Sequence, residues 1–132
     1  HAWTGGPLTL MHEFVAGVAP TAPGYAAYQV KPRLGGLSKV DVGFDSVKGR
    51  IELKLAREPD SFHLALDSPP DTKATVCVPV AEFGLKAVRV RGTTVWLNGK
   101  PTGSVPGLIA GPDMEGHAVF VVEPGEWRFE AR

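Results

Sequence analysis

The sequence predicts a mainly β protein, an antiparallel β-sandwich of about eight strands preceded by one N-terminal helix. Two observations predict the sandwich: apolar and polar residues alternate along short segments from residue 28 onward, and the 16 glycines and 12 prolines fall between these segments as turn residues. A third observation is that helical spacing is confined to the N-terminal end. At 132 residues the chain has the length of one ordinary domain.

The N-terminal helix is predicted from residue 7 to residue 18. Pro7 suits a first helical position, and Gly17 is placed to end the helix before Pro20. The apolar residues lie at helical spacings on more than one face; they are Leu8, Leu10, Met11, Phe14, Val15 and Val18. A helix that is apolar nearly all round requires burial on most sides, which one small sandwich does not offer. We therefore expect this helix to pack into a partner or to end a larger fold.

A rigid connector is expected at residues 19–24, because two prolines and a glycine disfavour both a helix and a central strand there. Beyond the connector the period is two, which is typical of half-buried strands. The expected strands are 28–30, 40–44, 51–55, 62–66, 76–80, 88–90, 95–97, 118–122 and 127–131. Asn98-Gly99 predicts a hairpin after the strand at 95–97, and Pro124-Gly125 predicts a type II turn before the last strand.

Composition excludes several classes of function. The chain has 14 basic and 14 acidic side chains, so no charge-driven partner such as nucleic acid or an anionic membrane is indicated. No apolar run approaches the ~18 residues of a membrane span. The single cysteine, Cys77, lies in an apolar run, where we expect a small buried side chain without a disulfide or a CxxC-type metal site. Cysteine usage leaves the cellular compartment open.

Four segments near the N-terminus carry a resemblance to a known family. They are His1-Ala2-Trp3-Thr4-Gly5-Gly6-Pro7, residues 15–20 (VAGVAP), residues 22–25 (APGY) and residues 30–37 (VKPRLGGL). In order and spacing this string resembles the C-terminal part of bacterial-type α-L-rhamnosidases, and residues 45–51, 68–76 and 123–129 agree more loosely. The chain departs from the family pattern at Leu34, where many members have a proline.

The resemblance implies a parent enzyme that hydrolyses terminal α-L-rhamnose from glycosides with inversion, using a carboxylic acid and a carboxylate. Both carboxylates belong to a helical (α/α)₆ barrel upstream of this chain, so we expect no catalytic residue, no cofactor and no glycosidase activity in the chain alone. Residues 1–21 are then the end of the barrel domain, and residues 22–132 are its C-terminal β-sandwich, which buttresses the barrel. The implied partners are the rest of the barrel and the rhamnoside substrate.

The family's motif histidine reaches the sugar, and aromatic side chains wall that pocket. By position, the resemblance therefore assigns a sugar contact to His1, and it assigns either the pocket wall or packing under the last barrel helix to Trp3. An imidazole can hydrogen-bond a sugar hydroxyl, and an indole stacks on C–H surface. Glu13 is expected as a structural partner on the helix, and a role at the floor of the barrel is the alternative. The other acids are expected to face solvent; they include Asp41, Glu52, Asp67, Asp71, Glu82 and Glu130.

Two other classes of function stay open. If His1 is a mature N-terminus, its amino and ring nitrogens and a second histidine suit copper; the candidates are His12, His63 and His117. The helix after His1 and the match to the rhamnosidase string weigh against this. A free-standing carbohydrate-binding module would need an exposed aromatic platform. Trp96 alternates with Val95 and Leu97 and is predicted on the outer face, whereas Trp127 is in phase with Phe129 and is predicted in the core.

Overall fold

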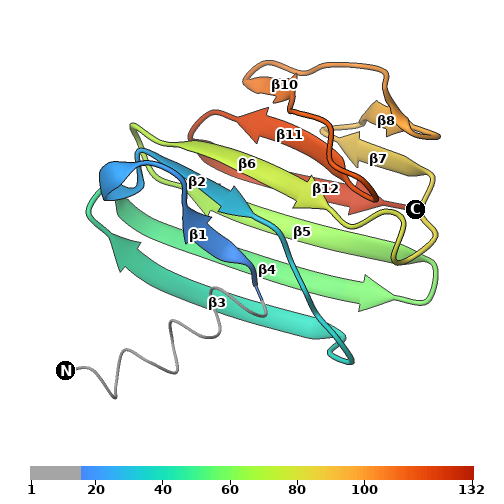
Figure 1. Cartoon of the computed structure of the whole chain (residues 1–132), viewed down its shortest axis with the longest axis horizontal. Helices are drawn as coiled ribbons and strands as arrows, with labels where there is room; N and C mark the ends of the chain where they lie inside the picture. The colour runs from blue at the N-terminus through green and yellow to red at the C-terminus, as the bar shows by residue number, and fades with distance from the viewer. Residues whose placement is uncertain (1–15) are drawn as a thin grey trace.

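The structure of the protein, a computed structural model, describes residues 16–132. This part of the chain forms twelve strands in two packed sheets (Figure 1). One sheet has five strands in the order β1-β2-β6-β11-β10, and the other has seven in the order β3-β4-β5-β12-β7-β8-β9. The predicted β-sandwich is therefore confirmed.

The strands of the five-stranded sheet are β1 (Val18–Pro20), β2 (Ala27–Val30), β6 (Lys73–Val78), β10 (Leu108–Ala110) and β11 (Ala118–Val122). The strands of the seven-stranded sheet are β3 (Lys39–Ser46), β4 (Gly49–Glu58), β5 (Ser61–Ser68), β7 (Ala87–Val90), β8 (Thr93–Leu97), β9 (Lys100–Pro101) and β12 (Gly125–Ala131). Neighbouring strands pair antiparallel except β2 and β6, which pair parallel. Nine of the twelve strands in the described residues were predicted from the sequence, whereas β1, β9 and β10 were not.

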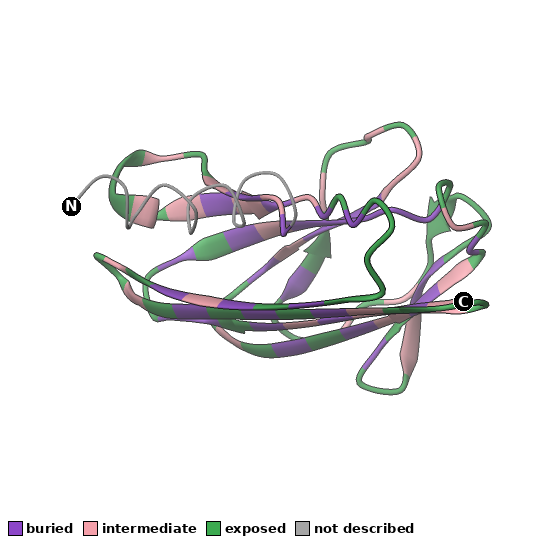
Figure 2. Ribbon diagram, turned by 90° about the horizontal axis from the view of Figure 1, so that it is seen from below, coloured by how far each residue is buried: buried purple, intermediate pink, exposed green. Residues whose placement is uncertain are grey.

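The core lies between the two sheets, because each strand turns one set of alternating side chains inward. Figure 2 shows the two layers, with buried and exposed residues alternating along the strands. Tyr28, Phe62, Phe120 and Phe129 are among the largest fully buried side chains. Phe120 of β11 and Phe129 of β12 have ring centroids 5.6 Å apart, which joins the two sheets by direct aromatic contact.

Cys77 is fully buried, as predicted. Burial raises the pKa of the Cys77 thiol to about 11, opposed only in part by the positive charge of Lys31. The protonated thiol therefore dominates at neutral pH, and this side chain behaves as a small apolar group.

The Asn98-Gly99 hairpin is also confirmed. Asn98 has φ +48° and Gly99 has φ +91°, which is the pair of positive φ values that a tight turn between β8 and β9 requires. The turn at residues 123–125, before the last strand, does not close a hairpin within one sheet. It leads from β11 in one sheet to β12 in the other, with Gly125 at φ +122°.

The prediction that the N-terminal helix extends to residue 18 is wrong. Residues 7–15 lie outside the described residues, but Ala16 and Gly17 are not helical and Val18–Pro20 form β1, which pairs with β2. Gly17 has φ +71°, and its carbonyl accepts a hydrogen bond of 2.9 Å from the backbone N–H of Lys31. This turn aligns Val18 with Val30, and both side chains are fully buried. Burial and pairing thus override the helical spacing.

The connector is shorter than predicted, because Ala19 and Pro20 belong to β1. Pro20 lies in the edge strand β1, where its missing N–H leaves no central pairing unsatisfied. Pro23–Tyr25 then form a single turn of 3-10 helix, η2, in which Gly24 departs from helical geometry with φ +64°.

A polar cross-link joins the sheets at one end of the core. The hydroxyl of Tyr28, in β2, is hydrogen-bonded to Ser68 Oγ, at the end of β5. Ser68 Oγ lies 2.9 Å from Thr72 Oγ1, which donates to the carbonyl of Pro69 at 2.7 Å. Ser68 and Thr72 are 3% exposed, so this chain of partners satisfies polar groups that burial would otherwise leave unpaired.

Replacing Gly17 by alanine should destabilise the protein strongly. A Cβ at Gly17 would lie 1.9 Å from the carbonyl oxygen of Lys31, and φ is positive. Gly35 is the matched control, because its φ is +59° and a Cβ there would meet nothing within 4 Å. We expect Gly35→Ala to lower the free energy of unfolding by about 1 kcal/mol and Gly17→Ala by at least about 2 kcal/mol in urea denaturation. Equal losses would show that the contact between Gly17 and Lys31 is unimportant.

Tyr28 should make stability fall at alkaline pH. Burial, opposed by the hydrogen bond to Ser68, raises the pKa of Tyr28 from 10.0 to about 12. The folded protein therefore keeps a proton that the unfolded chain releases, so this stabilisation is complete below pH 10 and is lost as pH rises toward 12. Tyr28→Phe should lower the free energy of unfolding by about 1 kcal/mol at neutral pH.

The same variant should remove about 1 kcal/mol per pH unit from the alkaline slope of stability. Parallel slopes for the variant and the unmodified chain, measured by urea denaturation at a series of pH values, would contradict this assignment.

Candidate functional site

The residues predicted to contact sugar, His1 and Trp3, lie outside the described residues, as do His12 and Glu13. His63 lies in β5, half-buried, with Nε2 3.4 Å from a carboxylate oxygen of Glu58. Within residues 16–132 no group of three or more His, Cys, Asp or Glu side chains is arranged to hold a metal ion. In the same part of the chain, no helix has the length and apolar character needed to cross a membrane.

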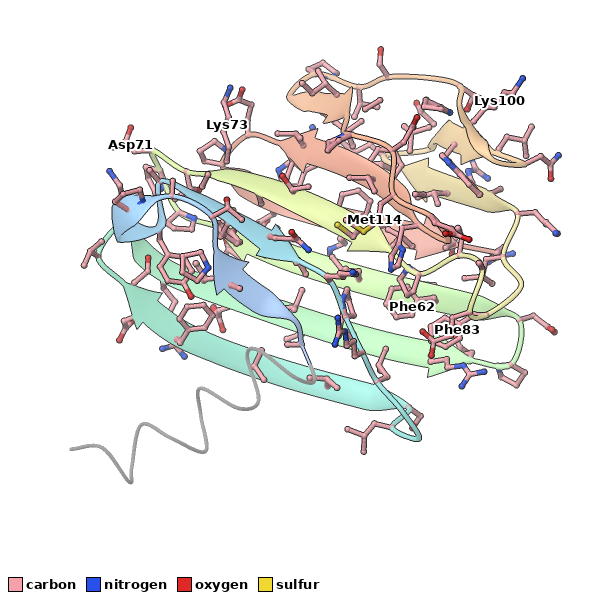
Figure 3. The ribbon with its side chains drawn as sticks, viewed as in Figure 1. Phe62, Asp71, Lys73, Phe83, Lys100 and Met114 are labelled. Carbon is pink, nitrogen blue, oxygen red and sulfur yellow. The ribbon has the colours of Figure 1, made fainter. Side chains whose placement is uncertain are left out.

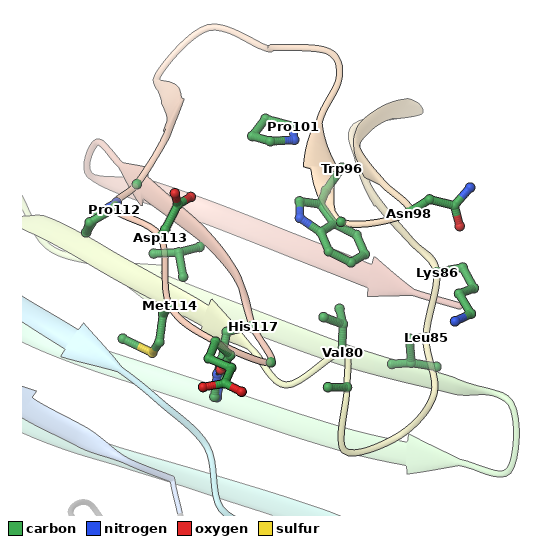
Figure 4. Close-up of a pocket in the computed structure, with 16 residues that line it drawn as sticks. Val80, Leu85, Lys86, Trp96, Asn98, Pro101, Pro112, Asp113, Met114 and His117 are labelled. Carbon is green, nitrogen blue, oxygen red and sulfur yellow. The ribbon is translucent and has the colours of Figure 1, made fainter.

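A pocket of about 590 Å³ lies where the last strands of the two sheets face each other. Three segments far apart in sequence line it: residues 80–86 after β6, residues 96–101 of the β8–β9 hairpin, and residues 111–119, which lead from β10 into β11. Figure 4 shows Trp96 in the middle of these segments. The volume of this pocket is in the range of small-molecule sites in proteins.

The placement of Trp96 corrects the prediction of an outer-face side chain. Val88 is paired with Trp96 and Arg89 with Thr94, so Val95 is an extra residue in β8. This β-bulge turns both Val95 and Trp96 inward, with exposed fractions of 0% and 9%, and leaves Leu97 exposed. Simple alternation could not reveal this shift. Trp127 is buried as predicted, and its indole N–H donates to the carbonyl of Glu123 at 2.7 Å.

The indole N–H of Trp96 differs from that of Trp127. Within the described residues no acceptor hydrogen-bonds to Trp96 Nε1, although the side chain is nine-tenths buried. Buried indole N–H groups usually have a partner. Figure 4 shows this nitrogen turned toward the side of the pocket on which Asp113 and Pro112 lie. The pocket therefore contains an unused donor that is aimed at its interior.

The loop opposite Trp96 is held by backbone hydrogen bonds. Gly111 N–H donates to the carbonyl of Val119 at 2.8 Å, and Ala81 N–H donates to the carbonyl of Gly116 at 3.0 Å. A Cβ on Gly111 would lie 2.7 Å from Val119 Cγ1, so the loop packs closely on β11. This packing fixes the two ends of the loop around the pocket.

Five charged or polar side chains border the pocket: Lys86, Asn98, Asp113, Glu115 and His117. His117 Nδ1 lies 2.8 Å from the carbonyl of Glu115, and because a carbonyl only accepts, Nδ1 carries the proton. In the neutral ring Nε2 is then an acceptor. Together with the apolar surface of Trp96, the pocket combines donors, acceptors and an aromatic wall.

The acids that the sequence placed toward solvent are exposed, except that Glu130 is half-buried. The register adds an arrangement that sequence reasoning missed. Asp67 is paired with Glu52 of β4 and with Glu126 of β12, so three carboxylates stand side by side on the outer face of the seven-stranded sheet. Like charges in directly opposite positions are destabilising. All three are exposed to water, and they lack the enclosed surroundings of a general acid.

The outer face of the five-stranded sheet has the opposite character. A single row of paired residues crosses all five strands without a charge: Ala19, Gln29, Thr75, Val121 and Ile109. Four of them are half-buried, and Ile109 is 64% exposed. In the strands described for this sheet the one charged residue is Lys73, at the start of β6 (Figure 3), where it lies 3.9 Å from Glu123.

Comparison with known proteins gives one family. Residues 17–92 match the family described as "Bacterial alpha-L-rhamnosidase C-terminal domain". The alpha-L-rhamnosidase of Streptomyces avermitilis is 28% identical over 120 residues, which cover 90% of this chain and 10% of that protein. The chain thus spans about a tenth of the length of this relative.

Solved structures show the same fold. The crystal structure of Streptomyces avermitilis alpha-L-rhamnosidase complexed with L-rhamnose matches 92% of this chain and 10% of its own, with a TM-score of 0.71 and 24% identity. The alpha-L-rhamnosidase from Dictyoglumus thermophilum matches 92% of this chain and 13% of its own, with a TM-score of 0.75 and 20% identity. A third, from Aspergillus terreus, has a TM-score of 0.62, covers 94% and 11%, and is 21% identical.

The family match extends over more than half of the chain, and the observed two-sheet sandwich agrees with these folds. The chain belongs to the family of bacterial alpha-L-rhamnosidase C-terminal domains.

Proposed function

We propose that this chain is the C-terminal portion of a glycoside hydrolase that releases terminal α-L-rhamnose from glycosides. In this proposal the catalytic carboxylates belong to a helical barrel that precedes the chain, and the β-sandwich buttresses that barrel. Family membership supports the parent enzyme, and the Streptomyces avermitilis relative, of which this chain covers 10%, leaves room for such a barrel.

The contrast between the two outer faces carries the proposal. The row formed by Ala19, Gln29, Thr75, Val121 and Ile109 offers an uncharged surface that can be covered without removing an ion from water. Depletion of charge is typical of the buried centre of an interface.

The opposite face would be costly to cover. There the row that crosses β3, β4, β5 and β12 consists of Asp41, Lys54, Ala65 and Arg128, and three carboxylates form the next row. The five-stranded sheet is therefore the face suited to the barrel.

The path of the chain supports the same face. The described residues begin at Ala16, directly before β1, and β1 is an edge strand of the five-stranded sheet. A domain that precedes β1 would therefore join the sandwich at the edge of this uncharged surface.

Residues 1–21 are assigned in this proposal to the end of the barrel domain and its connector, and residues 22–132 to the sandwich, although β1 itself pairs within the sandwich. His1 contacts the sugar, and Trp3 either walls the sugar pocket or packs under the last barrel helix. The chemistry of an imidazole donor or acceptor and of an indole face supports these roles.

Placing a charge on the uncharged face should weaken the contact with the barrel. In the full-length parent protein, Thr75→Glu should lower the midpoint of thermal unfolding by several degrees and reduce hydrolysis of p-nitrophenyl α-L-rhamnoside, because the carboxylate would be buried without a partner. Ala65→Glu is the matched control: Ala65 is also half-buried on a central strand, but it lies between Lys54 and Arg128. If both variants of the parent behave alike, this face is not the interface.

His1→Ala in the parent protein should lower kcat/KM for the same substrate by about five- to tenfold, the loss expected for one hydrogen bond of about 1 kcal/mol to the sugar. The matched control is His63→Ala, because His63 lies on the outer face of the seven-stranded sheet. Unchanged kinetics for His1→Ala, with normal thermal unfolding, would contradict a sugar contact.

A further inference from the structure

We propose that the pocket around Trp96 is a carbohydrate-binding site, in which the indole N–H of Trp96 donates to an oxygen of the sugar. The inference starts from two independent facts about one side chain: Trp96 is 9% exposed, and its Nε1 has no acceptor within the described residues. A buried donor without an acceptor costs free energy that a ligand oxygen can recover.

The β-bulge explains why this donor faces the pocket. The extra residue Val95 rotates Trp96 out of simple alternation, and bulges commonly re-aim a side chain beside a binding site. The hairpin turn at Asn98-Gly99 holds the far end of β8 in place, and Asn98 N–H donates to the carbonyl of Lys86 at 2.7 Å. The position of the indole is thus fixed by backbone pairing on both sides of the turn.

The other groups around the pocket favour a sugar over a charged ligand. Lys86 offsets one of the two negative charges of Asp113 and Glu115, so the lining carries a net charge of only about −1 and has no basic cluster for an anionic ligand. Sugar hydroxyls can donate to the carboxylate of Asp113 and to Nε2 of neutral His117, and they can accept from Trp96 Nε1. The C–H surface of a sugar ring matches the apolar remainder of the lining, as is usual for ligand pockets.

The pocket is placed away from the edge at which a preceding domain would join the sandwich. It lies beside β10 and β9, the last strands of the two sheets, whereas the chain reaches the five-stranded sheet at β1, on its opposite edge (Figure 1). The site uses only residues 80–119 and does not depend on a catalytic barrel, so its test is independent of the proposed function.

The test observes the indole N–H groups directly. The 132-residue chain, labelled with nitrogen-15, has three tryptophans, and Trp96→Phe identifies the resonance of Trp96 by its loss. L-Rhamnose, D-galactose and D-glucose are added separately. We expect at least one of them to shift the Trp96 resonance saturably. The Trp127 resonance should not move, because that N–H already donates to Glu123.

Affinity is then compared among variants by calorimetry with the sugar that shifts the resonance. Trp96→Phe keeps an aromatic ring but loses the donor, and it should weaken binding about fivefold. Asp113→Asn, in an exposed loop where folding is not at risk, should also weaken binding; Asp60→Asn, in the exposed turn between β4 and β5, is its control and should not. The proposal is overturned if none of the three sugars moves the Trp96 resonance, or if Asp113→Asn and Trp96→Phe both bind as tightly as the unmodified chain.

Discussion

Mutual burial of the two sheets' inner faces is the interaction on which this protein depends. Neither sheet could exist alone in water, because each turns a continuous apolar face inward. The two sheets are joined by apolar contacts, such as that of Phe120 with Phe129, and by a buried hydrogen bond between Tyr28 and Ser68. The last two long strands lie in different sheets, so the turn at residues 123–125 connects the layers covalently at a point where Trp127 also bonds to Glu123.

Much of this sandwich is predictable from the sequence because burial on one face of a strand imposes a period of two. The long strands β3, β4, β5 and β12 follow that period without interruption. Prediction fails where the signal is short or shifted. β1 and β10 contain three residues each and β9 contains two, too few for a period to be recognised. At Trp96 the bulge breaks the period itself, and a bulge is a property of the pairing of two strands, not of one segment.

The candidate sites are harder to predict from the sequence than the strands are. The family string at the N-terminus predicts a sugar contact for His1 without any knowledge of the fold. The Trp96 pocket has no such string, because it arises when residues near 83, 98 and 114 are brought together by strand order. Likewise, the charge-free row and the row of carboxylates exist only in the register between strands. The surface of a sheet therefore depends on which residues are paired between strands, and the order of residues along one strand does not reveal it.

The placement of β1 has a mechanical consequence. Any displacement of the part of the chain before Ala16 acts first on three residues at the rim of a sheet, held by antiparallel pairing to β2 and by the bond from Lys31 to Gly17. This edge strand has three pairs to one neighbour, whereas β2 is held on both sides, by β1 and by four pairs to β6. A pull on the chain before Ala16 would therefore act on a strand with one neighbour before it reaches the centre of the five-stranded sheet.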